Sequence, residues 1–168
     1  RDWVRLERLL YAHGVYLARG IDFARHAVPN NHLIAEALAM RELAELFAHW
    51  PEAASWKSLA NTLLREDITK QFYSTGEYCQ ASHTYHRFAL EMLTWWRASE
   101  AASRTPDAAL LERLDTLTHQ SATMLRWWMV DASRGLLPNF GANDGAHFLP
   151  LSGALYEDFR PALASVLG

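Results

Sequence analysis

Residues 82–96 read SHTYHRFALEMLTWW, and this stretch decides the fold class. Its apolar side chains recur every three or four residues, which is the spacing of one face of an α-helix. No part of the chain shows the strict two-residue alternation of a half-buried β-strand. The sequence therefore predicts an all-α protein. The apolar stripe consists of Tyr85, Phe88, Ala89, Met92, Leu93 and Trp96.

Three further helices are expected on the N-terminal side of this stretch. The first starts with the chain and should end near Gly20, because glycine is common just after a helix. The second follows Pro29-Asn30-Asn31 and should stop near Trp50-Pro51, and the third should run from about Ala54 to Phe72. The apolar surface of the second helix is wide, which indicates burial on more than one side.

On the C-terminal side, Thr105 is expected to cap a fifth helix that has Pro106 at its first position. A long irregular stretch follows from about Gly135 to Gly153, and a short last helix should cover residues 158–167. Compact domains avoid structureless stretches longer than about 12 residues unless function requires them. We therefore expect this loop to matter for function.

Helices joined alternately by short and long loops are typical of antiparallel hairpins. No residue-level repeat, low-complexity tract or linker divides the chain, so we expect one domain over residues 1–168. The chain opens with Arg1-Asp2-Trp3, inside an amphipathic pattern and without an initiator methionine. We interpret it as a piece of a longer protein.

Composition limits the classes of partner. Half of the residues are hydrophobic, which excludes a disordered chain. The net charge of −3 provides no overall basic field to hold a polyanion, so we expect no nucleic-acid partner, and an acidic substrate needs a local cluster of Arg, His and amide groups. No run of about 18 apolar residues predicts a membrane span. The single cysteine, Cys79, excludes an internal disulfide framework.

Three polar clusters lie at expected helix starts or in the long loop: residues 30–32 (NNH), 82–87 (SHTYHR) and 139–146 (NFGANDGA). Each has a structural explanation. An asparagine in the first cluster can cap a helix, Tyr85 can pack in the core with its hydroxyl paired, and the Asn, Asp and Gly of the third are ordinary turn residues. Functional residues also collect at such places.

Together, these stretches resemble the helical domain of the heparinase II/III-like polysaccharide lyases, a family that includes oligoalginate lyases. The matching segments are residues 30–36 (NNHLIAE), 71–91 with QF, Gly76 and SHTYHRFALE, and 141–146 (GANDGA). They follow the family's order, and the resemblance covers about residues 25–160.

The resemblance implies a fold and a domain context. Family members have an incomplete α/α toroid built from antiparallel helical hairpins, followed by β-sandwich domains that supply a further catalytic histidine. This chain is then expected to be the C-terminal part of the toroid. The β-sandwich lies outside these residues and would be its partner domain in the full-length protein, which we expect in the bacterial periplasm.

The family reaction is β-elimination at a uronic acid in an acidic polysaccharide or oligosaccharide, such as alginate or a glycosaminoglycan. A base removes the C5 proton, the 4-linked oxygen leaves, and the sugar carboxylate must be neutralised. The resemblance assigns carboxylate neutralisation to Asn31 and His32 and acid–base catalysis to Tyr85. A phenol is a weak base at neutral pH, so we expect Arg87 to lower the pKa of Tyr85.

Six further residues are expected to contact or order the substrate: Glu36, Gln80, His86, Arg87, Asn143 and Asp144. Many family members have Glu where Gln80 stands and Asp where Ala142 stands, and both departures concern substrate contacts. No cofactor is expected. The histidines lack the spacing of a zinc motif, so no metal site is expected either.

Other function classes stay open at this point. Glu36 and Glu91 could form the acid pair of a glycoside hydrolase. A polar cleft could also bind carbohydrate without cleaving it, and a purely structural helical domain would leave the three clusters far apart.

Overall fold

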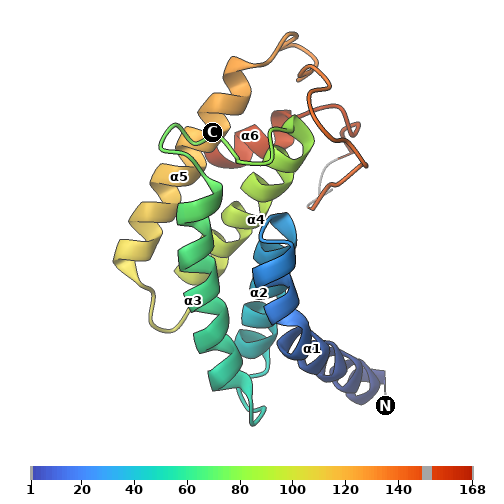
Figure 1. The fold of residues 1–168 in the computed structure, drawn as a ribbon, viewed down its shortest axis with the longest axis vertical. Helices are drawn as coiled ribbons and strands as arrows, with labels where there is room; N and C mark the ends of the chain where they lie inside the picture. Colours follow the sequence, from blue (N-terminus) through green and yellow to red (C-terminus); the bar gives the residue numbers. More distant parts are fainter. Residues whose placement is uncertain (1, 149–152, 168) are drawn as a thin grey trace. The chain divides into compact units, whose positions relative to one another are not determined.

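The computed structural model describes residues 2–148 and 153–167, and its regular structure is helical (Figure 1). In these residues the pairing of extended backbone is limited to two isolated bridges, Phe72–Tyr78 and Asp131–Leu136. The all-α prediction is confirmed, whereas the toroid stays a prediction. The helices are α1 (Asp2–Ala27), α2 (Asn31–Leu46), α3 (Ala53–Gln71), α4 (His83–Ala101), α5 (Ala108–Trp127) and α6 (Arg160–Leu167).

The chain divides into two compact units, Arg1–Lys70 and Gln71–Gly168. The expectation of a single domain over residues 1–168 stays a prediction. None of the described helices is long and apolar enough to cross a membrane.

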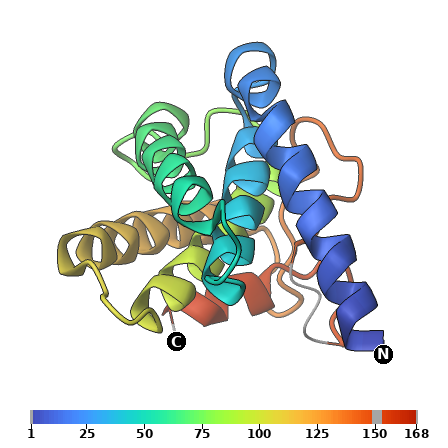
Figure 2. The same ribbon diagram turned by 90° about the horizontal axis from the view of Figure 1, so that it is seen from below.

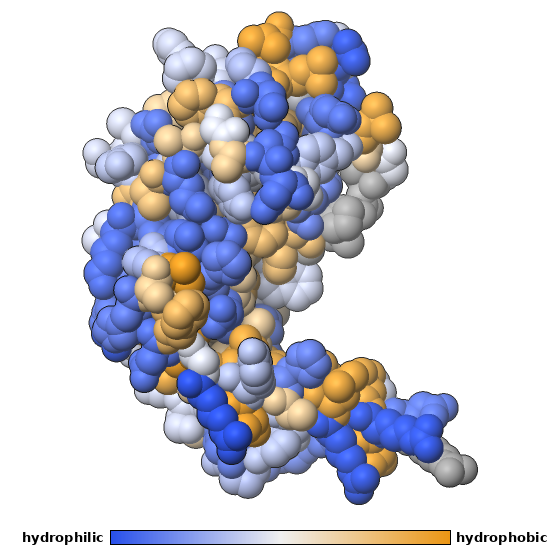
Figure 3. Space-filling model, turned by 45° about the vertical axis from the view of Figure 1, so that its right-hand side comes forward, coloured by the Kyte–Doolittle hydropathy of each residue, from blue (hydrophilic) through white to orange (hydrophobic). Residues whose placement is uncertain are grey.

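In the first unit, α1 packs against α2, and the ring of Trp56 from α3 lies against Gly14 of α1. A Cβ on Gly14 would lie 2.4 Å from the ring of Trp56, so glycine is what permits this approach. An aromatic cluster closes the unit, with the rings of Phe47 and Trp50 stacked at 4.2 Å and Tyr11 edge-on to Trp50 at 5.1 Å. The N-terminal part of α1 keeps exposed large hydrophobic side chains such as Trp3 and Leu9. Figure 3 shows hydrophobic and hydrophilic residues side by side on the surface of the protein.

Two expected helix ends in this unit are wrong. The first helix does not end at Gly20 but continues to Ala27, because Ile21 and Ala24 are buried and stabilise its last turns. It ends just before Pro29, which disfavours helical backbone at the preceding residue. The second helix ends at Leu46 rather than at Trp50-Pro51, with Phe47 as its C-cap.

In the second unit, α4 and α5 form an antiparallel hairpin, and α6 packs against both (Figures 1 and 2). Their shared core contains Leu90, Ala122, Leu125, Phe159 and Leu163. Apart from residues 149–152, which lie outside the described residues, the segment from Gly135 to Gly153 is irregular as expected.

The fifth helix starts later than expected, and the proposed cap is wrong. Asp107, rather than Thr105, is its N-cap, and its carboxylate accepts from the backbone N–H of Leu110 at 3.0 Å. The buried carboxylate of Glu100 in turn accepts from the backbone N–H of Asp107 at 2.9 Å. Pro106 therefore precedes the cap instead of opening the helix.

Candidate active site

Ser82, the N-cap residue of α4, links the start of this helix to the long loop between α5 and α6. Ser82 Oγ accepts a hydrogen bond from the backbone N–H of Tyr85 at 3.2 Å, which satisfies one donor of the first turn. The same hydroxyl donates to the carbonyl of Ala142 at 2.6 Å. One serine thus fixes both the first helical turn and the loop beside it.

Gly141 brings the loop against the helix start. It has a φ of +75°, and a Cβ there would lie 2.1 Å from the carbonyl oxygen of Ala81 and 2.7 Å from the Cα of Ser82. The backbone N–H of His83 donates to the carbonyl of Phe140 at 3.2 Å. Only glycine combines this backbone conformation with so close an approach.

The docked loop brings the carboxylate of Asp144 next to Tyr85. The hydroxyl of this half-buried phenol donates to Asp144 Oδ2 at 2.6 Å. The other carboxylate oxygen, Oδ1, accepts from the backbone N–H of Ala146 at 3.2 Å. The hydrogen bond to Asp144, helped by partial burial, raises the pKa of Tyr85 above its ordinary value.

Arg87 does not act on Tyr85 as we expected. Its side chain is fully buried, with the guanidinium 4.5 Å from the ring centre of Tyr156 and 4.4 Å from that of Phe159. It donates to the backbone carbonyls of Tyr156 and Ala146. The expected lowering of the pKa of Tyr85 is therefore wrong. Arg87 binds carbonyls of the loop instead, and the hydrogen bond from the phenol to Asp144 raises the pKa of Tyr85.

Two loop contacts were not expected from the sequence. The hydroxyl of Tyr156 donates to Asn143 Oδ1 at 2.7 Å and lies 3.2 Å from Thr84 Oγ1. Glu91 accepts from the backbone N–H of Phe148 at 2.9 Å. The sequence around Tyr156 contains no motif that predicts these contacts, because they form only when the loop folds onto α4.

Glu91 also faces the Nε2 of His147 at 3.2 Å, and it is buried. Through these two contacts the carboxylate of Glu91 holds the long loop, which gives this residue a structural role. The other member of the hydrolase pair that we considered, Glu36, is a half-buried residue of the first unit.

His86 lies on the inner side of α4. Burial lowers the pKa of His86 to about 4, so its imidazole is neutral at pH 7. Its Nε2 lies 2.7 Å from Ser121 Oγ of α5, and the backbone of Gly76 also bonds to the ring. Gln80 is half-buried, and within residues 2–148 and 153–167 its buried Oε1 has no hydrogen-bond partner. Substrate contact by either residue stays a prediction.

In the first unit, the two asparagines of the NNH cluster differ in their contacts. Asn30 is the N-cap of α2, and its Oδ1 accepts from the backbone N–H of His32 at 3.0 Å. Asn31 is 7% exposed, and among the described residues its side chain makes no hydrogen bond. Since Asn30 does the capping, the amide of Asn31 is available for another role. The meeting of Asn31 and His32 with Tyr85 stays a prediction.

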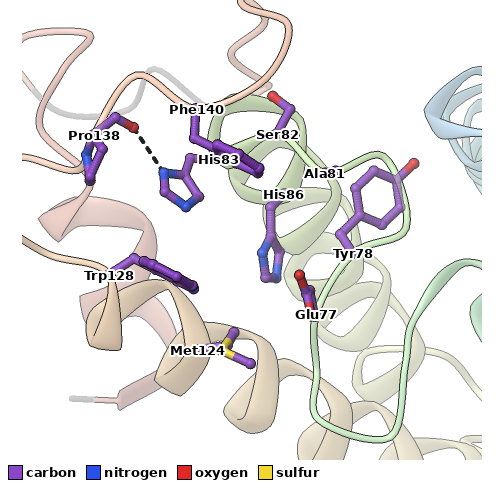
Figure 4. A pocket seen from close by; sticks show the side chains of 10 residues that line it. All are labelled: Glu77, Tyr78, Ala81, Ser82, His83, His86, Met124, Trp128, Pro138 and Phe140. Carbon is purple, nitrogen blue, oxygen red and sulfur yellow. Dashed lines mark hydrogen bonds between the residues drawn. The ribbon is translucent and has the colours of Figure 1, made fainter.

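A pocket of about 190 Å³ lies beside the start of α4 within the second unit (Figure 4). Trp128 and Phe140 line it and are more than half exposed, at 54% and 55%. His83 also lines it and holds the carbonyl of Pro138 through Nδ1 at 2.8 Å. Tyr85 and Asp144 are not among its lining residues. In the part of the chain that the structure describes, no group of three or more His, Cys, Asp or Glu side chains is placed to hold a metal ion.

A family model described as Heparinase II/III N-terminus matches residues 7–111, which is more than half of the chain. This chain belongs to the heparinase II/III family. The matched part of this heparinase II/III protein contains the clusters at 30–32 and 82–87, whereas the 139–146 cluster lies beyond it. Membership relates the protein to polysaccharide lyases and implies a polysaccharide as the class of substrate. No curated protein and no solved structure was found to match it.

Proposed function

We propose that this chain is part of a lyase that cleaves a uronic-acid-containing polysaccharide by β-elimination. The observation that carries the proposal is the position of Tyr85, a half-buried phenol at the first turn of α4 whose hydroxyl is already engaged in a short hydrogen bond with a carboxylate. Membership of the heparinase II/III family supports the reaction class.

The reaction needs two kinds of group. The C5 proton is weakly acidic because the carbanion forms beside a negative carboxylate, so that carboxylate must be neutralised before the proton leaves. The uncommitted amide of Asn31 can donate to it, helped by the exposed His32 next to it. Both lie at the N-terminus of α2, where a helix favours a nearby anion.

Tyr85 serves as the acid and base. Its raised pKa keeps the phenol protonated at neutral pH, so it can give its proton to the departing 4-linked oxygen. In this proposal Gln80 and Asn143, which we expect from the sequence to contact the substrate, lie around the same sugar. The β-sandwich partner domain and a periplasmic location belong to the proposal as family expectations.

Activity of the full-length protein on several polymers tests the proposal. Wild-type protein is incubated with alginate, heparan-type and hyaluronan-type polymers, and the ultraviolet absorbance of the unsaturated product is followed. We expect Tyr85→Phe to lower turnover by a factor on the order of 10² to 10⁴, the range for a lost general acid or base. Tyr73→Phe, which changes an exposed tyrosine outside the site, is the control and should match wild type.

Hydrolysis products without the double bond would contradict the lyase assignment. An unchanged turnover in Tyr85→Phe would remove this phenol from the mechanism.

A second candidate function is carbohydrate binding without cleavage. The exposed residues Trp128 and Phe140, which line the pocket, favour it, because aromatic rings can stack on a sugar. In that case Trp128→Ala should weaken binding of oligosaccharides by calorimetry, and no polymer should yield an unsaturated product.

A further inference from the structure

The hydrogen bond between Tyr85 and Asp144 raises a question about the elimination. The phenol must first remove the C5 proton and then protonate the leaving oxygen. A phenol that donates to a carboxylate at 2.6 Å is protonated and is not ready to act as a base by itself. The carboxylate, however, is an acceptor that lies next to the proton to be moved.

We propose that Asp144 accepts the hydroxyl proton of Tyr85 while Tyr85 removes the C5 proton, so that Tyr85 relays a proton between sugar and carboxylate. This inference rests on the lyase function proposed above. It gives Asp144 a different role from the substrate contact that the sequence led us to expect. Since Asp144 acts through Tyr85, it is a positioning residue.

The two steps balance without any co-reactant. In the first, the C5–H bond breaks, its electron pair stays on the sugar as an enolate, a new O–H bond forms on Tyr85, and the former phenol proton moves to Asp144 Oδ2. In the second, Asp144 returns that proton to Tyr85, and Tyr85 gives its own proton to the 4-linked oxygen as the C4–O bond breaks. The net result moves one proton from C5 to the leaving group.

The loop holds Asp144 in the orientation that the relay needs. The backbone N–H of Ala146 binds Oδ1, which leaves Oδ2 directed at the phenol. Gly141 and the bond from Ser82 to Ala142 fix the preceding turn against α4.

Tyr156, Arg87, Glu91 and His147 are charged or titratable residues of the second unit that lie near this pair. Besides Asp144, the titratable group that acts on Tyr85 is Tyr156 of the same loop. On α4, the hydrogen bonds of Arg87 go to loop carbonyls, and Glu91 faces His147. A raised phenol pKa agrees with the relay, because tyrosinate is scarce at neutral pH.

The pH dependence of turnover in Asp144→Asn separates the relay from its alternatives. We expect this variant of the full-length protein to lose activity at neutral pH by a factor on the order of 10² to 10⁴ and to regain it at alkaline pH, where tyrosinate forms and acts directly. Asp131→Asn, which removes a carboxylate from the same loop outside the site, should keep the wild-type profile. Asp144 is exposed, so its replacement should leave the melting temperature close to wild type.

Three outcomes would overturn the relay. Asp144→Asn could keep its neutral activity or exceed wild type, which would mean that the carboxylate only suppresses a tyrosinate base. It could lose activity at every pH, which would return Asp144 to direct substrate contact. A wild-type protein that cleaves no uronic polymer would overturn the lyase function together with the relay, so the two failures are distinguishable.

A second readout does not depend on catalysis. The phenol of Tyr85 can be titrated by ultraviolet difference spectra between each protein and its Tyr85→Phe counterpart. We expect Asp144→Asn to lower the pKa of Tyr85, because the accepting carboxylate is gone. The same titration in both proteins would show that the pair does not form in solution and would overturn the inference.

Discussion

At the scale of single residues, neighbouring asparagines at the start of α2 are suited to different tasks. Asn30 satisfies a backbone donor of the first helical turn, as N-cap residues do. Asn31 is buried, yet its amide makes no hydrogen bond within the described residues. An amide without a hydrogen bond in the described residues can donate to a substrate carboxylate without first breaking a bond within the protein.

The two asparagines should therefore respond differently to alanine. Asn30→Ala should lower the free energy of unfolding by about 1 kcal/mol through the lost cap and leave turnover near wild type. Asn31→Ala should lower turnover by a factor on the order of 10² to 10³, as for a lost donor to a developing anion, with little loss of stability. Urea denaturation and the elimination assay measure the two effects, and a reversal of the pattern would assign Asn31 to folding.

The sequence could identify Tyr85 as a candidate because it stands in a motif at a helix start. It could not identify the partner of the phenol. Arg87, two positions away in the chain, was expected to act on it, but residues two apart on a helix do not face each other. Asp144 lies 59 residues away and reaches Tyr85 only after the loop docks.

At the scale of elements, the contact between the long loop and the start of α4 organises the second unit. Its tightest point is Gly141, whose missing side chain lets the loop lie on Ala81 and Ser82. Gly145 has a similar positive φ of +83°, but no atom of the described residues lies within 4 Å of the position of its Cβ. Alanine at Gly145 would therefore meet backbone strain alone, whereas alanine at Gly141 would meet backbone strain and steric overlap.

Alanine at each glycine tests this difference. Gly145→Ala should cost about 1–2 kcal/mol for the left-handed backbone. Gly141→Ala should add a further 1–3 kcal/mol, roughly, for the overlap, and should release the loop. Limited proteolysis and urea denaturation would detect this, and equal losses in both variants would mean that the loop does not dock on Ala81.

The turn before α4 forms a second junction between elements. Gly76 presses on the backbone of α5, where a Cβ would lie 2.4 Å from the carbonyl carbon of Gln120 and 2.5 Å from the nitrogen of Ser121. The neutral imidazole of His86 sits at this junction and bonds to Ser121. Protonation of His86 would place a charge in a buried site.

Stability should therefore fall in acid. Because burial lowers the pKa of His86 from 6.5 to about 4, the unfolded chain binds more protons than the folded one between these values. As pH falls through this window, the free energy of unfolding should drop by an amount on the order of 3 kcal/mol. His86→Gln should remove that part of the slope, whereas His119→Gln, on an exposed face of α5, should keep it. An unchanged slope in His86→Gln would contradict the buried neutral state.

Helix positions were predictable where apolar periodicity alone sets them, as in α3 and α4. Helix ends were less so, because they depend on contacts made by the folded chain. Ile21 and Ala24 carry α1 past Gly20, and Glu100 helps Asp107 rather than Thr105 to begin α5.

At the scale of the whole molecule, the proposed lyase mechanism needs residues from both compact units of the heparinase II/III chain. Asn31 and His32 belong to the first compact unit, and Tyr85 and Asp144 belong to the second. The proposal requires Asn31, His32 and Tyr85 to act on a single uronate, with the amide at its carboxylate and the phenol at its C5 proton, while Asp144 acts through Tyr85.

The structure of the full-length Tyr85→Phe protein with a bound uronic-acid oligosaccharide tests this requirement most directly, because we expect the substitution to slow cleavage while it keeps the ring. We predict that one uronate carboxylate lies within hydrogen-bond distance of the Asn31 amide, about 2.7–3.2 Å, with its C5 over the edge of ring 85. An oligosaccharide bound away from either residue, or an Asn31 amide turned from the sugar that touches ring 85, would contradict the account.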